Sequence, residues 1–265
     1  MKKKKVLYVL IFIICLGSLG YGNIQYKLKL EDKAEAAKKD LEDQRAGSKE
    51  RKESSTMPDV SALTKNLPEN AQEVIAERWK AGETVKVGAI GSETTSGEDS
   101  WGTLFQQKLQ AAYGKEHIEF LPKGFKNEWS ITVIKDKKYQ PLLDQRLDVL
   151  LIEPFLLNDN GKINIRDTLA SLDILLADVK RANPETVVLL QPPNPIYKPR
   201  FYLDQVNQLK RYANEKGMAY IDHWSAWPDQ ESEELKMYVN TENHQPTKKG
   251  EQLWADDLAD LFTGK

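Results

Sequence analysis

The stretch Leu147–Ile152 reads L-D-V-L-L-I and decides the fold class. Its nearly continuous apolar run is typical of a strand in a parallel sheet that is covered by helices on both faces. We therefore predict that residues 147–152 form a buried strand of an α/β domain.

The segments on either side alternate between strand-like and helix-like apolar spacing. Further strands are predicted at residues 85–90, 118–121, 187–190 and 219–221, and helices at 70–80, 102–113, 165–181, 203–216 and 249–262. This alternation predicts one domain with a mostly parallel five-stranded sheet and helices on both faces. Because ligands of such sheets bind at the carboxyl ends of the strands, the loops that follow the strands are where a site is expected.

The N-terminus has the features of a membrane element. Lys2–Lys5 form a basic cluster, and residues 6–26 carry no charge. About 20 apolar residues span a bilayer, and lysines before the span place the following domain outside the cytoplasm. Two alternatives stay open, which are a signal peptide cleaved near Gly20 or Gly22 and lipidation at Cys15. All three place the domain beyond the cytoplasmic membrane.

Residues 27–59 are rich in charged and small residues and cannot bury a core, so we predict a stalk between the anchor (1–26) and the domain (60–265). The net charge of −2 and the lack of a basic stripe argue against nucleic acid as a partner. A single cysteine and three histidines without ligand spacing argue against a zinc site. No cofactor is expected.

Four loops after predicted strands carry groups that could do chemistry. Residues 91–97 (G-S-E-T-T-S-G) offer hydroxyls and backbone N–H groups at a strand-to-helix turn, which suit an oxyanion or merely cap a helix. Gly124 in the second loop and Asn158 in the third are possible oxyanion donors or ordinary turn residues. Glu242 and His244 in the last loop are a possible base with its orienting carboxylate.

The order of these loops resembles the SGNH/GDSL hydrolase family over nearly the whole domain, from about Val85 onward. That family has a G-D-S-L-type turn after the first strand, a glycine after the second, a G-x-N-D turn after the third and a D-x-x-H-P segment before the last helix. Residues 87–91 with 101–102 look like the opening strand and helix start, and residues 186–193 look like the fourth strand. The resemblance implies a three-layer α/β/α, flavodoxin-like domain of the SGNH-hydrolase type, in which Gly124 and Asn158 are oxyanion donors.

The departures from the family pattern fall on its catalytic positions. In the direct register, Ser92 takes the aspartate position and Glu93 takes the position of the nucleophilic serine. Aligning Pro246 with the family's proline puts Gln245 at the histidine, with His244 one residue away. A glutamine cannot accept a proton from a serine as histidine does. The G-x-N-D glycine is also missing.

Two hypotheses about function follow. The first is a membrane-anchored serine ester hydrolase, with deacetylation of a cell-envelope glycan as one expected reaction. Its residues would be Ser92 as the nucleophile, His244 as the base, Glu242 as its orienter and Gly124 and Asn158 as oxyanion donors. Glu93 acting as a base on water is a variant of it.

The second hypothesis is a catalytically inactive module of the same fold that binds a cell-wall polymer or a protein partner. Glu93 at the family's nucleophile position and Gln245 at its base position motivate this hypothesis. Trp224, Trp227 and Tyr197 could line a carbohydrate-facing cleft or pack in the core.

Overall fold

The structure, a computed structural model, describes residues 58–265. The predicted anchor and all but the last two residues of the predicted stalk lie outside this range. None of the helices within residues 58–265 combines the length and the apolar character that a bilayer-spanning segment requires.

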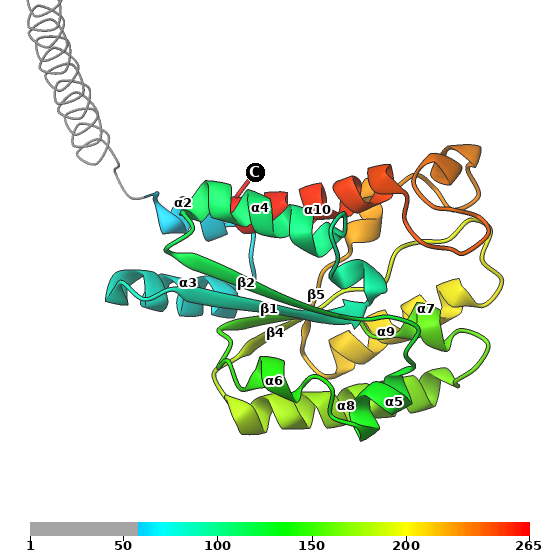
Figure 1. The fold of residues 1–265 in the computed structure, drawn as a ribbon, viewed down its shortest axis with the longest axis horizontal. Helices are drawn as coiled ribbons and strands as arrows, with labels where there is room; N and C mark the ends of the chain where they lie inside the picture. Colours follow the sequence, from blue (N-terminus) through cyan, green and yellow to red (C-terminus); the bar gives the residue numbers. More distant parts are fainter. Residues whose placement is uncertain (1–57) are drawn as a thin grey trace, which may run out of the picture. The chain divides into compact units, whose positions relative to one another are not determined.

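A sheet of five parallel strands forms the centre of the domain, as predicted (Figure 1). The strands lie in the order β2-β1-β3-β4-β5. Their bounds are Val85–Ser92 for β1, Ile118–Phe125 for β2, Val149–Ile152 for β3, Val187–Leu190 for β4 and Ala219–Tyr220 for β5. The stretch that predicted a buried strand therefore supplies β3, the middle strand of the sheet.

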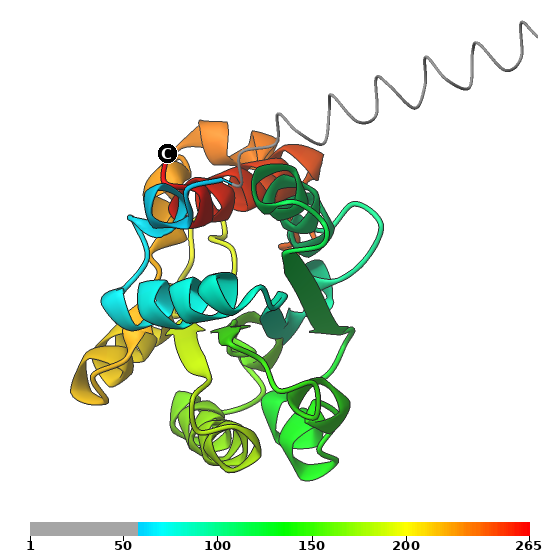
Figure 2. The same cartoon turned by 90° about the vertical axis from the view of Figure 1, so that its left-hand side faces the viewer.

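Helices cover both faces of the sheet, so the three-layer α/β/α prediction is confirmed (Figures 1 and 2). One face carries α2 (Val60–Thr64), α4 (Trp101–Tyr113) and α10 (Lys248–Thr263), and the other carries α5 (Ser130–Lys135), α6 (Gln140–Leu143), α8 (Ile165–Ala182) and α9 (Tyr202–Glu215). Helix α3 (Glu69–Ala81) lies near the amino ends of the strands, and the short α7 (Leu156–Asp159) follows β3. Three 3-10 turns, η1 (Glu93–Thr95), η2 (His223–Ala226) and η3 (Glu233–Met237), complete the elements. The short helices were not predicted because they hold too few residues to show a helical period.

The apolar run of β3 divides its side chains between two cores. Val149 and Leu151 pack with α4 and α10, whereas Leu150 and Ile152 pack with α8 and α9. Successive side chains of a strand point to opposite faces, so a strand between two helical layers must be apolar at every position. All four side chains are fully buried, and each stabilises the fold by roughly 1.5–3 kcal/mol.

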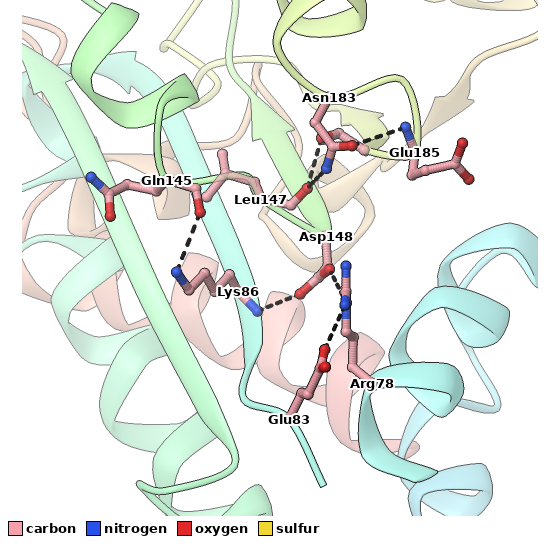
Figure 3. A network of polar contacts seen from close by, with 9 residues as sticks. Arg78, Glu83, Lys86, Gln145, Leu147, Asp148, Asn183 and Glu185 are labelled. Atoms are coloured by element: carbon pink, nitrogen blue, oxygen red, sulfur yellow. Dashed lines mark hydrogen bonds and ion pairs between the residues drawn. The ribbon is translucent and has the colours of Figure 1, made fainter. Parts of the chain in front are cut away.

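A polar network closes the amino end of the sheet and explains the one charged residue in L-D-V-L-L-I (Figure 3). The buried carboxylate of Asp148 accepts hydrogen bonds from the backbone N–H of Lys86 and from Nε of Arg78, both at 2.8 Å. Arg78 also pairs with Glu83 at 2.5 Å. Asp148 therefore fastens helix α3 to the beginning of β1.

The second loop was predicted at the wrong place. Residues 122–125 (P-K-G-F) are the second half of β2 and pair with β1 as far as Ser92↔Phe125. Pro122 is tolerated there because β2 is an edge strand, where a missing N–H costs no ladder bond. The loop after β2 consequently begins at Lys126.

Candidate active site

A cavity of about 430 Å³ lies among the loops at the carboxyl ends of β1, β2 and β3. It is lined by Glu93, Asn127, Trp129, Leu157, Asn158, Asn160, Asn243, His244 and Gln245, and we call it the Glu93 pocket. Its size is that of an ordinary small-ligand site. Three of the predicted site residues, Glu93, Asn158 and His244, meet in this pocket.

Glu93 reaches the pocket because β1 ends at Ser92 and the chain turns at once into η1. Its side chain is 30% exposed, and its Oε2 lies 3.6 Å from Nζ of Lys126. The Lys126 side chain is 76% exposed, and an ion pair that open to solvent contributes little stability. The pocket therefore contains a carboxylate at the position where the family pattern has its serine.

Ser92 points into the protein and not into the pocket. Its Oγ lies 2.9 Å from Oγ1 of Thr94 and 3.1 Å from Oε2 of Glu153, and the residue is 5% exposed. The expected hydrogen bond between Ser92 and His244 is not formed. The physical reason is that Glu153, at the end of the neighbouring strand, is a buried carboxyl that needs donors and takes this hydroxyl.

Glu153 ties down the turn that carries Glu93. Its Oε2 accepts hydrogen bonds from the backbone N–H of Ser92 at 3.2 Å, from Oγ of Ser92 and from Oγ1 of Thr95 at 3.0 Å. Burial raises the pKa of Glu153 to about 7, while the hydrogen bonds from Ser92 and Thr95 act in the opposite direction.

Gly91 allows the buried carboxyl to come this close. A Cβ at Gly91 would lie 2.4 Å from Oε2 of Glu153 and 2.3 Å from Oγ1 of Thr95, so a larger residue would displace both groups. The glycine of the G-S-E-T-T-S-G turn is therefore explained by the packing of Glu153 against β1.

His244 and Glu242 do not form the predicted pair. His244 has a left-handed backbone (φ 62°), its N–H donates to the carbonyl of Asn240 at 2.9 Å, and the residue lines the pocket from an exposed turn. Glu242 lies in solvent, and its carboxylate contacts no other part of residues 58–265 by a hydrogen bond or ion pair. The reason is that the side chain of Asn240 and backbone bonds hold this turn, so nothing draws the carboxylate to the imidazole.

The two predicted oxyanion donors are placed differently from one another. Gly124 lies within β2, outside the pocket, and its N–H donates to Oγ of Ser96 at 3.0 Å, so this prediction is wrong in its geometry. Asn158 does line the pocket, and its Nδ2 donates one hydrogen bond to the carbonyl of Glu128 at 3.0 Å. An amide nitrogen has a second N–H, which leaves Asn158 a donor for a ligand.

Six of the nine lining residues were not among the predicted site residues, and two of the six, Trp129 and Asn127, lie outside all four predicted loops. Trp129 is 47% exposed, and Asn127 has a left-handed backbone (φ 54°). Both follow β2 directly, so the rule that ligands bind after strand ends would have found them had the end of β2 been placed correctly. The three aromatic residues considered instead are held by packing, as Trp227 is buried and Trp224 and Tyr197 pack against the two cores.

The Glu93 pocket combines one carboxylate, one imidazole, one exposed indole and several side-chain amides. No serine, threonine or cysteine is among its lining residues, and no group of three metal-ligating side chains occurs in residues 58–265. The arrangement can bind a polar ligand by hydrogen bonds and ring contacts. It holds no hydroxyl nucleophile in contact with a base.

Comparison with known proteins places the fold. No protein-family model and no curated protein sequence matches the chain. Among solved structures, a protein of the lipolytic G-D-S-L family from Desulfitobacterium hafniense is 19% identical with a TM-score of 0.56, covering 67% of this chain and 99% of its own. An acetylxylan esterase from Geobacillus stearothermophilus is 16% identical (TM-score 0.55; 67% and 94% covered). A carbohydrate esterase of family 3 from Talaromyces cellulolyticus is also 16% identical (TM-score 0.54; 66% and 95% covered). With its sheet order and its layers, the described domain therefore has the fold of the SGNH/GDSL hydrolases.

Proposed function

We propose that this protein is a membrane-anchored module, facing out of the cell, that binds a glycan of the cell envelope in the Glu93 pocket. The observation that carries the proposal is the placement of the two neighbouring side chains at the end of β1, where the pocket receives a carboxylate and not a hydroxyl. The Ser92 hydroxyl is buried against Glu153, while Glu93 and an exposed indole, that of Trp129, line the cavity. The uncharged run after Lys2–Lys5 supports the location.

The chemistry of the lining suits a sugar. A pyranose has a face of C–H groups and a rim of hydroxyls, so it fits an aromatic face beside groups that both donate and accept hydrogen bonds. Trp129 offers the ring, and the amides of Asn127, Asn158 and Gln245 offer the donors and acceptors. Two proteins of similar fold are described as an acetylxylan esterase and a carbohydrate esterase, which supports a glycan as the ligand.

Binding to purified envelope polymers tests this proposal. The purified protein should co-sediment with peptidoglycan sacculi or be retained by immobilised teichoic acid, and Trp129→Ala should lower the affinity at least tenfold. Phe201→Ala is the matched control, because Phe201 is a 72% exposed aromatic residue that does not line the pocket. Retention that is equal for the wild type and for Trp129→Ala would contradict the proposal.

A second function is favoured by the presence of Glu93, His244 and Asn158 in one pocket. In it, the Glu93 carboxylate takes a proton from a water whose oxygen attacks an ester carbonyl, and Asn158 donates to the resulting oxyanion. The C–O bond to the alcohol then breaks, and protonated Glu93 returns its proton to the departing alkoxide oxygen, so that the acid and the alcohol leave and the carboxylate is restored. The esterases among the proteins of similar fold support this reaction class. Hydrolysis of p-nitrophenyl acetate or of an acetylated glycan should then fall by about 10²–10⁴ in Glu93→Gln, the range expected for losing a general base. Unchanged turnover in Glu93→Gln would exclude this mechanism.

A further inference from the structure

The lining of the Glu93 pocket contains an acidic residue and no lysine or arginine to balance it. Among the nine lining residues, Glu93 is the single carboxylate, and none is a lysine or an arginine. His244 is the one other titratable side chain of the lining. A cavity of this kind presents a negative charge that a cationic group of a ligand would neutralise.

Within residues 58–265, the cation paired with Glu93 is Lys126, and the pair is loose. Nζ of Lys126 lies 3.6 Å from Oε2 of Glu93, whereas a charge-assisted hydrogen bond measures about 2.7–2.9 Å. The Lys126 side chain is 76% exposed, so it keeps its hydration and can swing away at little cost. The Glu93 carboxylate is therefore available to a competing cation.

The other lining groups match an ammonium ion as well. An ammonium has three N–H donors and no acceptor, so it requires oxygen acceptors around it. The side-chain amides of Asn127, Asn160 and Gln245 make no hydrogen bond within residues 58–265, and each has a carbonyl oxygen. The exposed indole of Trp129 adds the aromatic face that attracts a cation most strongly.

We propose that the Glu93 pocket recognises a primary ammonium group carried by the glycan, either the free amine of an amino sugar or the amine of an aminoacyl ester. This inference rests on the proposed glycan binding and specifies which chemical group of the polymer the pocket recognises. Glu93 supplies the charge, Trp129 the aromatic face and the amides the remaining acceptors.

The test compares each amine with its acetylated form, which keeps the shape and loses the charge. Calorimetric titration of the purified protein uses a glucosamine oligomer beside the N-acetylglucosamine oligomer of the same length, and D-alanine methyl ester beside its N-acetyl form. At pH 6 both amines are largely protonated. The amine form should bind at least tenfold more tightly, and which pair shows the preference tells the two sources apart.

Two charge variants give effects of opposite sign. Glu93→Gln should abolish the preference for the amine, and Lys126→Gln should increase it severalfold because it removes the competing cation. Glu119→Gln and Lys115→Gln are the matched controls, since both residues are exposed and lie near the amino end of β2, away from the pocket. They should leave the ratio of the two affinities unchanged.

The outcomes distinguish a failure of the ammonium proposal from a failure of the proposed glycan binding. Equal binding of amine and acetylated forms, both lost in Trp129→Ala, overturns the ammonium proposal and leaves glycan binding standing. The ammonium proposal is likewise overturned, and glycan binding stands, if the protein binds neither form but still co-sediments with sacculi in a way that Trp129→Ala abolishes. A protein that is not retained by any envelope polymer overturns the proposed function and the inference together.

Discussion

Replacing Glu153 with glutamine should change how the stability of the protein depends on pH. Burial raises the pKa of this carboxyl from its ordinary value of 4.5 to about 7 in the folded protein. Between these two values the folded state keeps a proton that the unfolded chain releases. The stability that Glu153 contributes is therefore fully present below pH 4.5 and is lost as the pH rises through 7. At about 1.4 kcal/mol for each pH unit, this interval of about 2.5 units corresponds to roughly 3–4 kcal/mol.

The assay is urea unfolding of the wild type and of Glu153→Gln at steps from pH 4.5 to pH 8. Glutamine keeps a carbonyl oxygen to accept from Ser92 and Thr95 but has no proton to lose, so the variant should lose less stability over this range. Burial also raises the pKa of Glu251, to about 8, so some decline should remain in the variant. Glu119→Gln, an exposed substitution, should follow the wild type. Parallel stability curves for the wild type and Glu153→Gln would refute the reasoning.

Three further predictions concern the same turn and the far end of the sheet. Ser92→Ala should lower the free energy of unfolding by about 1–3 kcal/mol, because Glu153 loses a buried donor, and mass spectrometry should find no fluorophosphonate adduct on Ser92 in the wild type. Gly91→Ala should cost about 1–3 kcal/mol in a denaturant titration, since its Cβ would overlap Glu153 and Thr95. Asp148→Ala should cost about 3 kcal/mol, and Asp144→Ala, at the exposed residue that directly follows α6, less than about 0.5 kcal/mol. Equal losses would show that the hydrogen bonds of Asp148 to Arg78 and Lys86 do not stabilise the fold.

The sheet and the longer helices could be predicted because their signals are local. The alternation of apolar runs placed β4 at its observed bounds and α8 to within one residue of its C-terminal end. The end of β2 was missed because Pro122 and Gly124 are turn residues in most contexts. Their place in a strand follows from the pairing with β1, which no local pattern records.

The candidate site was found as a set of loops but not as a set of contacts. Glu93, Asn158 and His244 meet in one pocket because the parallel strands end at a common edge. The direction of the Ser92 side chain depends on Glu153, which is 61 positions away in the chain. Glu153 directly follows a predicted strand, and no local sequence pattern indicates that its carboxyl is buried. The sequence therefore could not show that the Ser92 hydroxyl is hydrogen-bonded to Glu153.

The most direct test of the account is nuclear magnetic resonance of the isotopically labelled protein, titrated with amino-sugar oligomers or peptidoglycan fragments. We expect the signals of the Trp129 indole N–H and of the Asn127 and Asn158 side-chain amides to shift together, while the signal of the buried Trp254 indole stays unchanged. Shifts confined to other surfaces of the domain, with Trp129 unmoved at saturation, would contradict a binding site at the Glu93 pocket.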